Sequence, residues 1–249
     1  MLCAVPRMPT TNAKPMPHAD EPLLVISPHL DDAVFSCGAA VAAAPDSIVC
    51  TVFAGVPRDA LVTGWDAQCG FANAHQAMRA RHAEDAAALD ALGAHPVHLG
   101  FLDSQYAGDS RATPDDLATA LLDVIRATAC RALVVPLGLF HSDHDVVHRA
   151  CRTAWLADPA LVCIAYEDAL YRRMDGLVQT RLADLRACGV IATPVSERID
   201  TALLARHHEA KQRAVSRYVS QLKAFGPTGY DDVFAPERFW TLQPAHHDR

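Results

Sequence analysis

Polar residues gather at three places along the chain, each shortly after an apolar run. Pro28-His29-Leu30-Asp31-Asp32 follows Leu23 to Ser27, and His141-Ser142-Asp143-His144 comes soon after Ala132 to Pro136. Asp103 follows a third, shorter run. In open parallel sheets, ligands bind outside the carboxyl ends of the strands. Because all three clusters would lie at that edge, we expect them to form one site.

The residue types in these clusters suit a catalytic metal. A catalytic zinc ion takes three nitrogen or oxygen ligands from the protein and leaves one position for water. His29 and Asp32 are three residues apart at a strand-to-helix turn, so both can face one point. His144 can complete the set from the neighbouring strand end. We therefore expect Zn²⁺ at these three residues, with Fe²⁺ and Co²⁺ as alternative metals.

Three further residues of the clusters could move protons. Asp31 stays free beside the metal, where it can accept a proton from the metal-bound water as general base. His141 can donate to the developing oxyanion or the leaving nitrogen, with Asp143 holding its tautomer and raising its pKa. A single His-Asp pair at a helix start usually only caps the helix. Two such clusters at neighbouring strand ends favour a catalytic interpretation.

The remainder of the chain predicts the fold that positions these clusters. From residue 23 onward, short apolar runs alternate with longer helical stretches, which is typical of βα units. We expect a single α/β domain over residues 23–244, a Rossmann-like three-layer sandwich with a mainly parallel sheet. Residues 1–22 hold five prolines and are expected to form a flexible extension, with a frayed tail at residues 245–249.

Element boundaries follow from hydrophobic periodicity and from the turn residues. A long loop is expected at residues 54–70 and one long helix at residues 201–224, whereas residues 178–198 give no clear pattern. The pattern predicts strands at 23–27, 47–53, 97–99, 132–136 and 161–166, and helices at 31–44, 73–92, 114–129 and 145–156.

Composition narrows the class of protein. Hydrophobic residues make up 51% of the chain and the net charge is −7, with no run of Lys and Arg, so nucleic acid is not an expected partner. No apolar stretch of about 18 residues predicts a membrane span. The eight cysteines show no regular spacing and are expected to be reduced thiols. Because reduced thiols are typical of the cytoplasm, we expect a cytoplasmic enzyme. A homo-oligomer is compatible with the sequence.

At these motifs the sequence resembles the LmbE/PIG-L family of zinc-dependent N-acetylglucosaminide de-N-acetylases. The family motifs read Pro-His-Pro-Asp-Asp-Glu and His-Pro-Asp-His, and this chain departs from them at Leu30, Ala33 and Ser142. None of these departures removes a proposed ligand, base or acid. Further marks of the family are Arg81-His82-Ala83-Glu84, Leu99-Gly100-Phe101-Leu102-Asp103 and Tyr166-Glu167-Asp168.

The resemblance implies an N-deacetylase that removes an acetyl or similar acyl group from an amino-sugar-containing small molecule or glycoconjugate. Position by position, it implies the same metal ligands, base and His-Asp pair as the residue types do. It also implies a substrate-binding arginine, which we place at Arg81, and Asp103 lies in another family mark. Trp65 and Tyr106 could stack on a sugar face.

Three other functions compete with this interpretation. His29-x-Asp31 with a distant histidine also fits the triad of non-haem Fe(II) oxygenases, although the oxygenases with that motif are all-β. His144-Asp145-Val146-Val147-His148 imitates the His-Glu-x-x-His motif of metallopeptidases but lacks its glutamate. A non-catalytic sugar-binding relative could use the same cleft without turnover.

Overall fold

The strands form one sheet at the centre of the molecule. A computed structural model describes residues 21–128, 130–195 and 201–245, and within them the sheet has the order β3-β2-β1-β4-β5-β7-β6. Strands β1 to β5 run parallel, whereas β7 is antiparallel to both β5 and β6. The strands are β1 (Leu23–Ser27), β2 (Ile48–Thr51), β3 (His95–His98), β4 (Ala132–Pro136), β5 (Val162–Tyr166), β6 (Val190–Pro194) and β7 (Phe239–Pro244).

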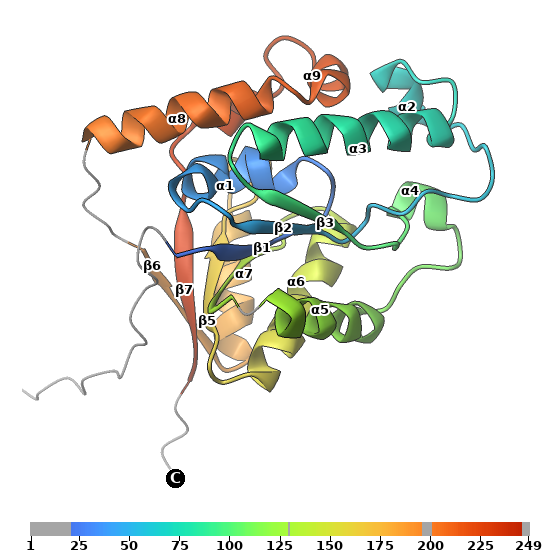
Figure 1. Ribbon diagram of the computed structural model, residues 1–249. Coiled ribbons are helices and arrows are strands. Elements are labelled where there is room, and N and C mark those ends of the chain that lie inside the picture. Colours follow the sequence, from blue (N-terminus) through green and yellow to red (C-terminus); the bar gives the residue numbers. More distant parts are fainter. Residues whose placement is uncertain (1–20, 129, 196–200, 246–249) are drawn as a thin grey trace, which may run out of the picture.

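Helices cover both faces of this sheet, which confirms the predicted three-layer α/β architecture (Figure 1). One layer contains α1, α3 and α8, and the opposite layer contains α5, α6 and α7 (Figure 1). The helices are α1 (Asp32–Ala43), α2 (Gly64–Cys69), α3 (Ala74–Asp90), α4 (Ser104–Ala107), α5 (Pro114–Thr128), α6 (Ser142–Ala157), α7 (Leu177–Ala187), α8 (Thr201–Val215) and α9 (Val219–Phe225), with a 3₁₀ turn η1 (Asp231–Phe234).

Strand β1 is buried on both faces, which explains its uninterrupted apolar sequence. Leu24 and Ile26 pack with the layer of α5 and α6, while Val25 packs with the layer of α1 and α8. Full burial of such a side chain stabilises the fold by about 1.5–3 kcal/mol. Because β1 pairs with β2 on one side and β4 on the other, the topological switch point falls between β1 and β4, the two strands after which the predicted metal ligands follow in the chain.

The structure differs from the sequence-based prediction in its last third. The expected helix at 201–224 is broken into α8 and α9 at Tyr218, whose backbone is not helical and whose hydroxyl donates to buried Asp85 at 2.8 Å. Glu84 then accepts the Ser220 N–H at 2.9 Å near the start of α9. These tertiary hydrogen bonds leave no trace in local periodicity.

The structure also differs from the prediction at other places along the chain. The predicted loop at 54–70 contains α2, which begins at the capping side chain of Thr63. The region without a clear pattern forms α7 and β6, and β7 inserts between β5 and β6. The predicted extension at 1–22 and tail at 245–249 lie almost entirely outside the described residues. In the described part of the chain, every helix is too short or too polar to cross a membrane.

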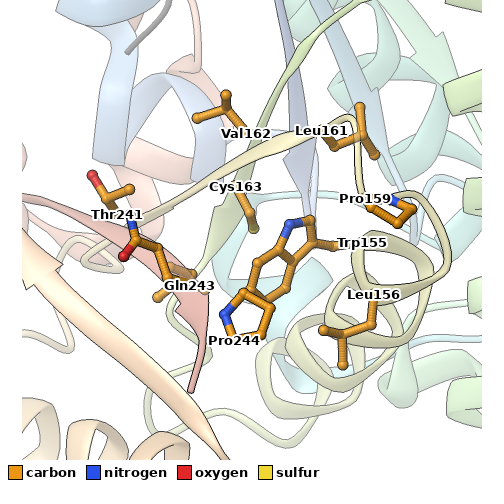
Figure 2. Close-up of a pocket in the computed structure, with 10 residues that line it drawn as sticks. Trp155, Leu156, Pro159, Leu161, Val162, Cys163, Thr241, Gln243 and Pro244 are labelled. Carbon is orange, nitrogen blue, oxygen red and sulfur yellow. The ribbon is translucent and has the colours of Figure 1, made fainter. Parts of the chain in front are cut away.

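A mostly apolar hollow lies at the amino end of β5, beside the last turn of α6 and β7. Figure 2 shows Trp155 in this hollow together with Cys163, Gln243 and Pro244. The polar clusters follow the opposite, carboxyl ends of β1 and β4. This hollow is therefore separate from the site that carries the candidate chemistry.

Candidate active site

The turn between β1 and α1 places His29 and Asp32 side by side. The Ser27 hydroxyl donates to the His29 carbonyl at 2.6 Å and accepts the Ala33 N–H at 3.0 Å, which closes the turn. Asp32 Oδ2 accepts the His29 N–H at 2.8 Å and lies 3.1 Å from His29 Nδ1. Asp31 occupies the N-cap position of α1, yet its side chain makes no capping hydrogen bond. The capping explanation therefore does not account for this carboxylate.

His144 reaches the same point from the first turn of α6. Its Nε2 lies 3.2 Å from Asp32 Oδ2, and its Nδ1 lies 2.7 Å from Asp168 Oδ1. The other oxygen of Asp168 accepts the backbone N–H groups of Gly138 and Leu139 at 2.8 and 3.0 Å. A proton on Nδ1 is thus directed at Asp168, which leaves Nε2 of His144 available as a ligand.

The second ring nitrogen of His29 also faces carboxylates. His29 Nε2 lies 3.1 Å from Asp143 Oδ2 and 3.8 Å from Asp103 Oδ2. Asp143 Oδ2 additionally accepts the Ser104 N–H at 3.1 Å. The contact between Asp143 and His141 is made by the Asp143 backbone N–H, which donates to His141 Nδ1 at 3.2 Å. Asp143 thus holds the tautomer of His141 through its main chain rather than its carboxylate.

The pKa of His141 corrects one expectation from the sequence. Burial lowers this pKa, and the neighbouring rings of His29 and His144 lower it further, while Asp143 raises it by less. The predicted increase is therefore wrong, because the other two imidazoles and the loss of solvent outweigh one carboxylate. Since Nδ1 of His141 accepts the Asp143 N–H, its Nε2 carries the proton of the neutral ring.

Two sets of side chains bring possible metal ligands together in the described part of the chain. His29, Asp32 and His144 form one, and His29, His141 and Asp143 form the other; within each set the ligand atoms lie within 4.8 Å of one another. Zn–N and Zn–O distances of about 2.0–2.1 Å in a tetrahedral site separate neighbouring ligand atoms by about 3.3 Å. The distances of 3.1 and 3.2 Å from Asp32 Oδ2 are close to that spacing.

Close packing of acidic and imidazole groups perturbs their pKa values. Burial and then the charge of Asp32 raise the pKa of Asp31 to about 7. Burial opposes ionisation of Asp32, but His144 and His29 together hold its pKa well below its usual range. Burial likewise opposes protonation of His29, although Asp103 and the bonded carboxylates raise its pKa well above the usual value. A carboxylate whose pKa is near 7 is suited to general base catalysis at neutral pH.

The predicted substrate contacts lie in different environments. Arg81 on α3 lines the cleft, is 5% exposed, and has no hydrogen-bond partner for its Nε, while its Nη1 lies 4.0 Å from Asp103 Oδ2. Asp103 and Trp65 also line the cleft. Tyr106 is buried, and its hydroxyl donates to Asp66 at 2.8 Å. Its side chain belongs to a small apolar cluster and not to the cleft lining.

The cleft has further walls that the sequence did not reveal. Phe35, Tyr171, Gln221 and Phe225 line it together with the polar groups. Gln221 accepts a hydrogen bond from the indole N–H of Trp65 at 3.1 Å. These residues come from α1, α9 and the segment after β5, so only the packed fold brings them to the metal ligands.

The α/β fold, with two sets of possible metal ligands at one edge of its sheet, agrees with the class of metal-dependent hydrolases. Residues 24–155 match the model of the PIG-L family, described as GlcNAc-PI de-N-acetylase, and this match covers more than half of the chain. The chain belongs to the PIG-L family and is a metal-dependent N-deacetylase of amino-sugar substrates. The resemblance seen in the sequence motifs is thereby confirmed. No curated protein matches the chain.

Solved structures of two deacetylases resemble this chain. A deacetylase (Orf2*T) of the teicoplanin biosynthetic pathway is 26% identical, with a TM-score of 0.74 over 90% of this chain and 98% of that one. The pseudoaglycone deacetylase Dbv21 is 25% identical, with a TM-score of 0.71 over 92% and 100%. The 4-carboxy-2-hydroxymuconate hydratase GalB from Pseudomonas putida shares only the fold, at 16% identity, a TM-score of 0.52 and coverage of 92% and 99%.

Proposed function

We propose that this protein is a zinc-dependent enzyme that hydrolyses the N-acetyl group of an amino sugar, with His29, Asp32 and His144 as the metal ligands. One observation carries the ligand assignment: Asp32 Oδ2 lies within 3.2 Å of a nitrogen on each imidazole, and the other nitrogen of each ring faces a carboxylate. Rings held in this way are typical of metal-ligating histidines. When bound, zinc lowers the pKa of a coordinated water toward about 7 and polarises the acyl carbonyl.

Asp31 is the general base in this proposal. Its carboxylate lies in the cleft, is not used to cap α1, and has a pKa raised to about 7. It accepts a proton from the attacking water as the new C–O bond forms. It then returns this proton to the amide nitrogen as the C–N bond breaks, so that the products are acetate and the free amine of the sugar.

His141 stabilises the negative charge that develops on the acyl oxygen. The Asp143 backbone N–H occupies its Nδ1, so the Nε2–H of the neutral ring is the donor available to the cleft. Donation by a neutral imidazole agrees with the lowered pKa of this ring. Loss of one such donor typically slows turnover by about 10²- to 10³-fold.

Arg81 and Asp103 are placed to bind the sugar. Arg81 lines the cleft wall, so its guanidinium can donate hydrogen bonds to substrate hydroxyl groups. Asp103 can accept hydrogen bonds from hydroxyl groups, and Trp65 offers an indole face to the ring. Orf2*T is a deacetylase of the teicoplanin biosynthetic pathway and Dbv21 is a deacetylase of the A40926 pseudoaglycone, which supports a substrate larger than a single sugar.

Residues 23–244 form the catalytic domain in this proposal, and the enzyme acts in the cytoplasm. Cys37, Cys50 and Cys163 are buried free thiols, which agrees with a reducing compartment. Competing functions receive less support. Helices alternate with strands instead of the all-β fold that the oxygenase interpretation needs, and His148 directs its Nδ1 at the Pro136 carbonyl rather than joining His144 in a metal set.

Acetate release tests the proposal. The metal-depleted protein and the protein reconstituted with zinc are each incubated with methyl N-acetylglucosaminide and N-acetylglucosamine, and acetate is quantified alongside bound metal. We expect acetate only from the reconstituted protein, at about one zinc per chain. Stoichiometric zinc without acetate release from a panel of N-acetylated sugars would instead support a binding protein. Turnover that needs oxygen and Fe(II) would support an oxygenase.

A further inference from the structure

The rim of the cleft carries strained backbone beside the site. Among the described non-glycine residues, a positive φ occurs at Asp46, Phe140 and Leu170. Phe140 and Leu170 both flank Tyr171, the first in space and the second in sequence. Left-handed backbone is unfavourable for bulky side chains and persists where the surroundings enforce it, often at ligand sites. Strained backbone on two sides of the Tyr171 ring indicates that the fold holds this part of the cleft edge in a defined position for ligand binding.

Phe140 is held in a tight turn directly before His141. The His141 N–H donates to the Leu139 carbonyl at 2.7 Å, and Phe140 is the middle residue of this turn, with φ of +59°. A turn of this kind is rare and costs free energy. Its consequence is that the phenyl ring lies outside the core, 65% exposed. The fold thus maintains a large apolar group in solvent next to a candidate catalytic residue.

Tyr171 extends this apolar surface into the site. Its ring centroid lies 5.4 Å from that of Phe140 and 5.2 Å from that of His144, and Tyr171 lines the cleft. Neighbouring Leu170 lines the cleft as well, and its N–H is fixed by Asp232 Oδ2 at 2.7 Å. An aromatic surface therefore runs from a proposed metal ligand outward to the exposed Phe140.

The chemistry of this surface differs from that of the cleft floor. His29, Asp31, Asp32 and Asp103 offer charge and hydrogen bonds, which suit the hydroxyl and amide groups of a sugar. The rings of Phe140 and Tyr171 offer stacking and apolar contact instead. A substrate made only of sugar would leave the exposed phenyl ring without a complementary group.

We propose that Phe140 and Tyr171 form an aromatic subsite that binds an apolar or aromatic group attached to the amino sugar. This inference rests on the proposed N-deacetylase function and narrows its substrate class to amino-sugar conjugates with such a group. The group is either an aromatic aglycone at the anomeric carbon or an extended N-acyl chain. Either group, the aglycone or the acyl chain, would present an apolar surface to the rings of Phe140 and Tyr171.

Three substrates distinguish binding of an aglycone from binding of an acyl chain. The zinc-loaded full chain is assayed with methyl N-acetylglucosaminide, phenyl N-acetylglucosaminide and methyl N-octanoylglucosaminide. An aglycone subsite raises kcat/KM for the phenyl glycoside about 5- to 50-fold above the methyl glycoside, mainly through KM, and an acyl subsite does the same for the octanoyl compound. Equal kcat/KM for all three would overturn the proposal.

Substitutions of the two residues test whether their rings cause the substrate preference in kcat/KM. Phe140→Gly removes the ring and accepts the positive φ without strain, so the turn is retained. We expect it and Tyr171→Ala to reduce the preference for the favoured compound toward one, while Phe140→Tyr and Tyr171→Phe restore it. Ile191→Ala is the matched control, since Ile191 is a 46% exposed apolar residue on β6 that does not line the cleft. A preference that survives Phe140→Gly and Tyr171→Ala contradicts the subsite.

Equilibrium binding separates failure of the subsite from failure of the proposed function. Phenyl glucosaminide has no acyl group to lose, and N-octanoylglucosamine binding is measured on the metal-depleted protein, so neither ligand turns over. We expect at least one to bind about 5- to 50-fold more weakly to Phe140→Gly than to the wild type. If no substrate is deacylated but this loss is seen, the deacetylase function fails and the subsite stands. If acetate is released and neither affinity changes, the subsite fails alone.

Discussion

Nδ1 of His144 and Oδ1 of Asp168 lie 2.7 Å apart, and both side chains are 1% exposed. The same carboxylate accepts the N–H groups of Gly138 and Leu139 in the segment that follows β4. Asp168 therefore connects the end of β5 to the end of β4 and fixes the orientation of a proposed metal ligand. A buried carboxylate behind a histidine also increases the basicity of the ring as a ligand.

Asp168→Asn should weaken metal binding. The amide keeps the size of the side chain but loses the negative charge behind His144, so we expect affinity for zinc to fall about 10- to 100-fold. Competition with a chelator of known affinity measures the change. Glu167→Gln is the control, because Glu167 is buried next in sequence but accepts from the Trp240 indole and belongs to neither metal set. An equal loss in both variants would show that the effect is only structural.

Asp31→Asn should separate catalysis from metal binding. Asp31 belongs to neither candidate metal set, so the variant should keep about one zinc per chain. Because the amide cannot accept the proton of the attacking water, kcat for deacetylation should fall about 10²- to 10⁴-fold. Metal analysis and acetate release on the same sample test both parts. An active, zinc-loaded variant would exclude Asp31 as the base.

Asp32→Asn and Asp143→Asn distinguish the two metal sets. If His29, Asp32 and His144 hold the ion, Asp32→Asn removes a ligand and should abolish stoichiometric zinc. Asp143→Asn should retain the ion with lower affinity, since Asp143 then only orients His29 through a 3.1 Å contact. Chelator competition on both variants ranks the losses. The reverse order would assign the metal to His29, His141 and Asp143.

Gly138→Ala should destabilise the fold at the end of β4. Gly138 has a φ of +80°, and an added Cβ would lie 2.6 Å from the Cβ of His148. Backbone strain and overpacking together should lower the free energy of unfolding by about 2–5 kcal/mol. Gly176→Ala is the control, because Gly176 has a φ of +81° but no atom within 4 Å of the added Cβ. Urea unfolding should show a smaller loss in the control, and equal losses would leave the close contact without effect.

His148 should make the protein sensitive to acid. Burial lowers its pKa to about 4, against about 6.5 in an unfolded chain, and its Nδ1 lies 2.9 Å from the Pro136 carbonyl. Above pH 6.5 the ring is neutral in both states. As the pH falls from 6.5 to 4, the unfolded chain gains a proton that the folded protein excludes, so about 3 kcal/mol of stability is lost.

His148→Asn tests this pH dependence. The Asn amide can replace the ring as donor to Pro136 but does not titrate. The free energy of unfolding of the variant should therefore fall less than that of the wild type between pH 6.5 and 4, by up to about 3 kcal/mol. Parallel curves for the two proteins would mean that His148 is not the titrating group. Retention of zinc by the variant would also argue against the metallopeptidase interpretation.

Local sequence patterns determined much of the fold. Strands β1 and β4 begin and end where their apolar runs predict, because strands buried on both faces must be apolar throughout. The N-terminal boundary of α5 follows from a proline at its first position. Local patterns did not predict β7 or the break at Tyr218, because a distant strand pairing and a hydrogen bond to Asp85 create them.

For the site, too, the sequence predicts some features and the tertiary structure decides others. By itself, the sequence determined which residue types follow the strands, and parallel pairing then brings His29, Asp32 and His144 together. Only the tertiary structure decided that the Asp143 carboxylate contacts His29, that Tyr106 is outside the cleft lining, and that Tyr171 lines the cleft in contact with Phe140. The physical reason is that spacing along a strand end fixes position to within a few ångströms, whereas hydrogen-bond partners and burial depend on side chains from distant elements.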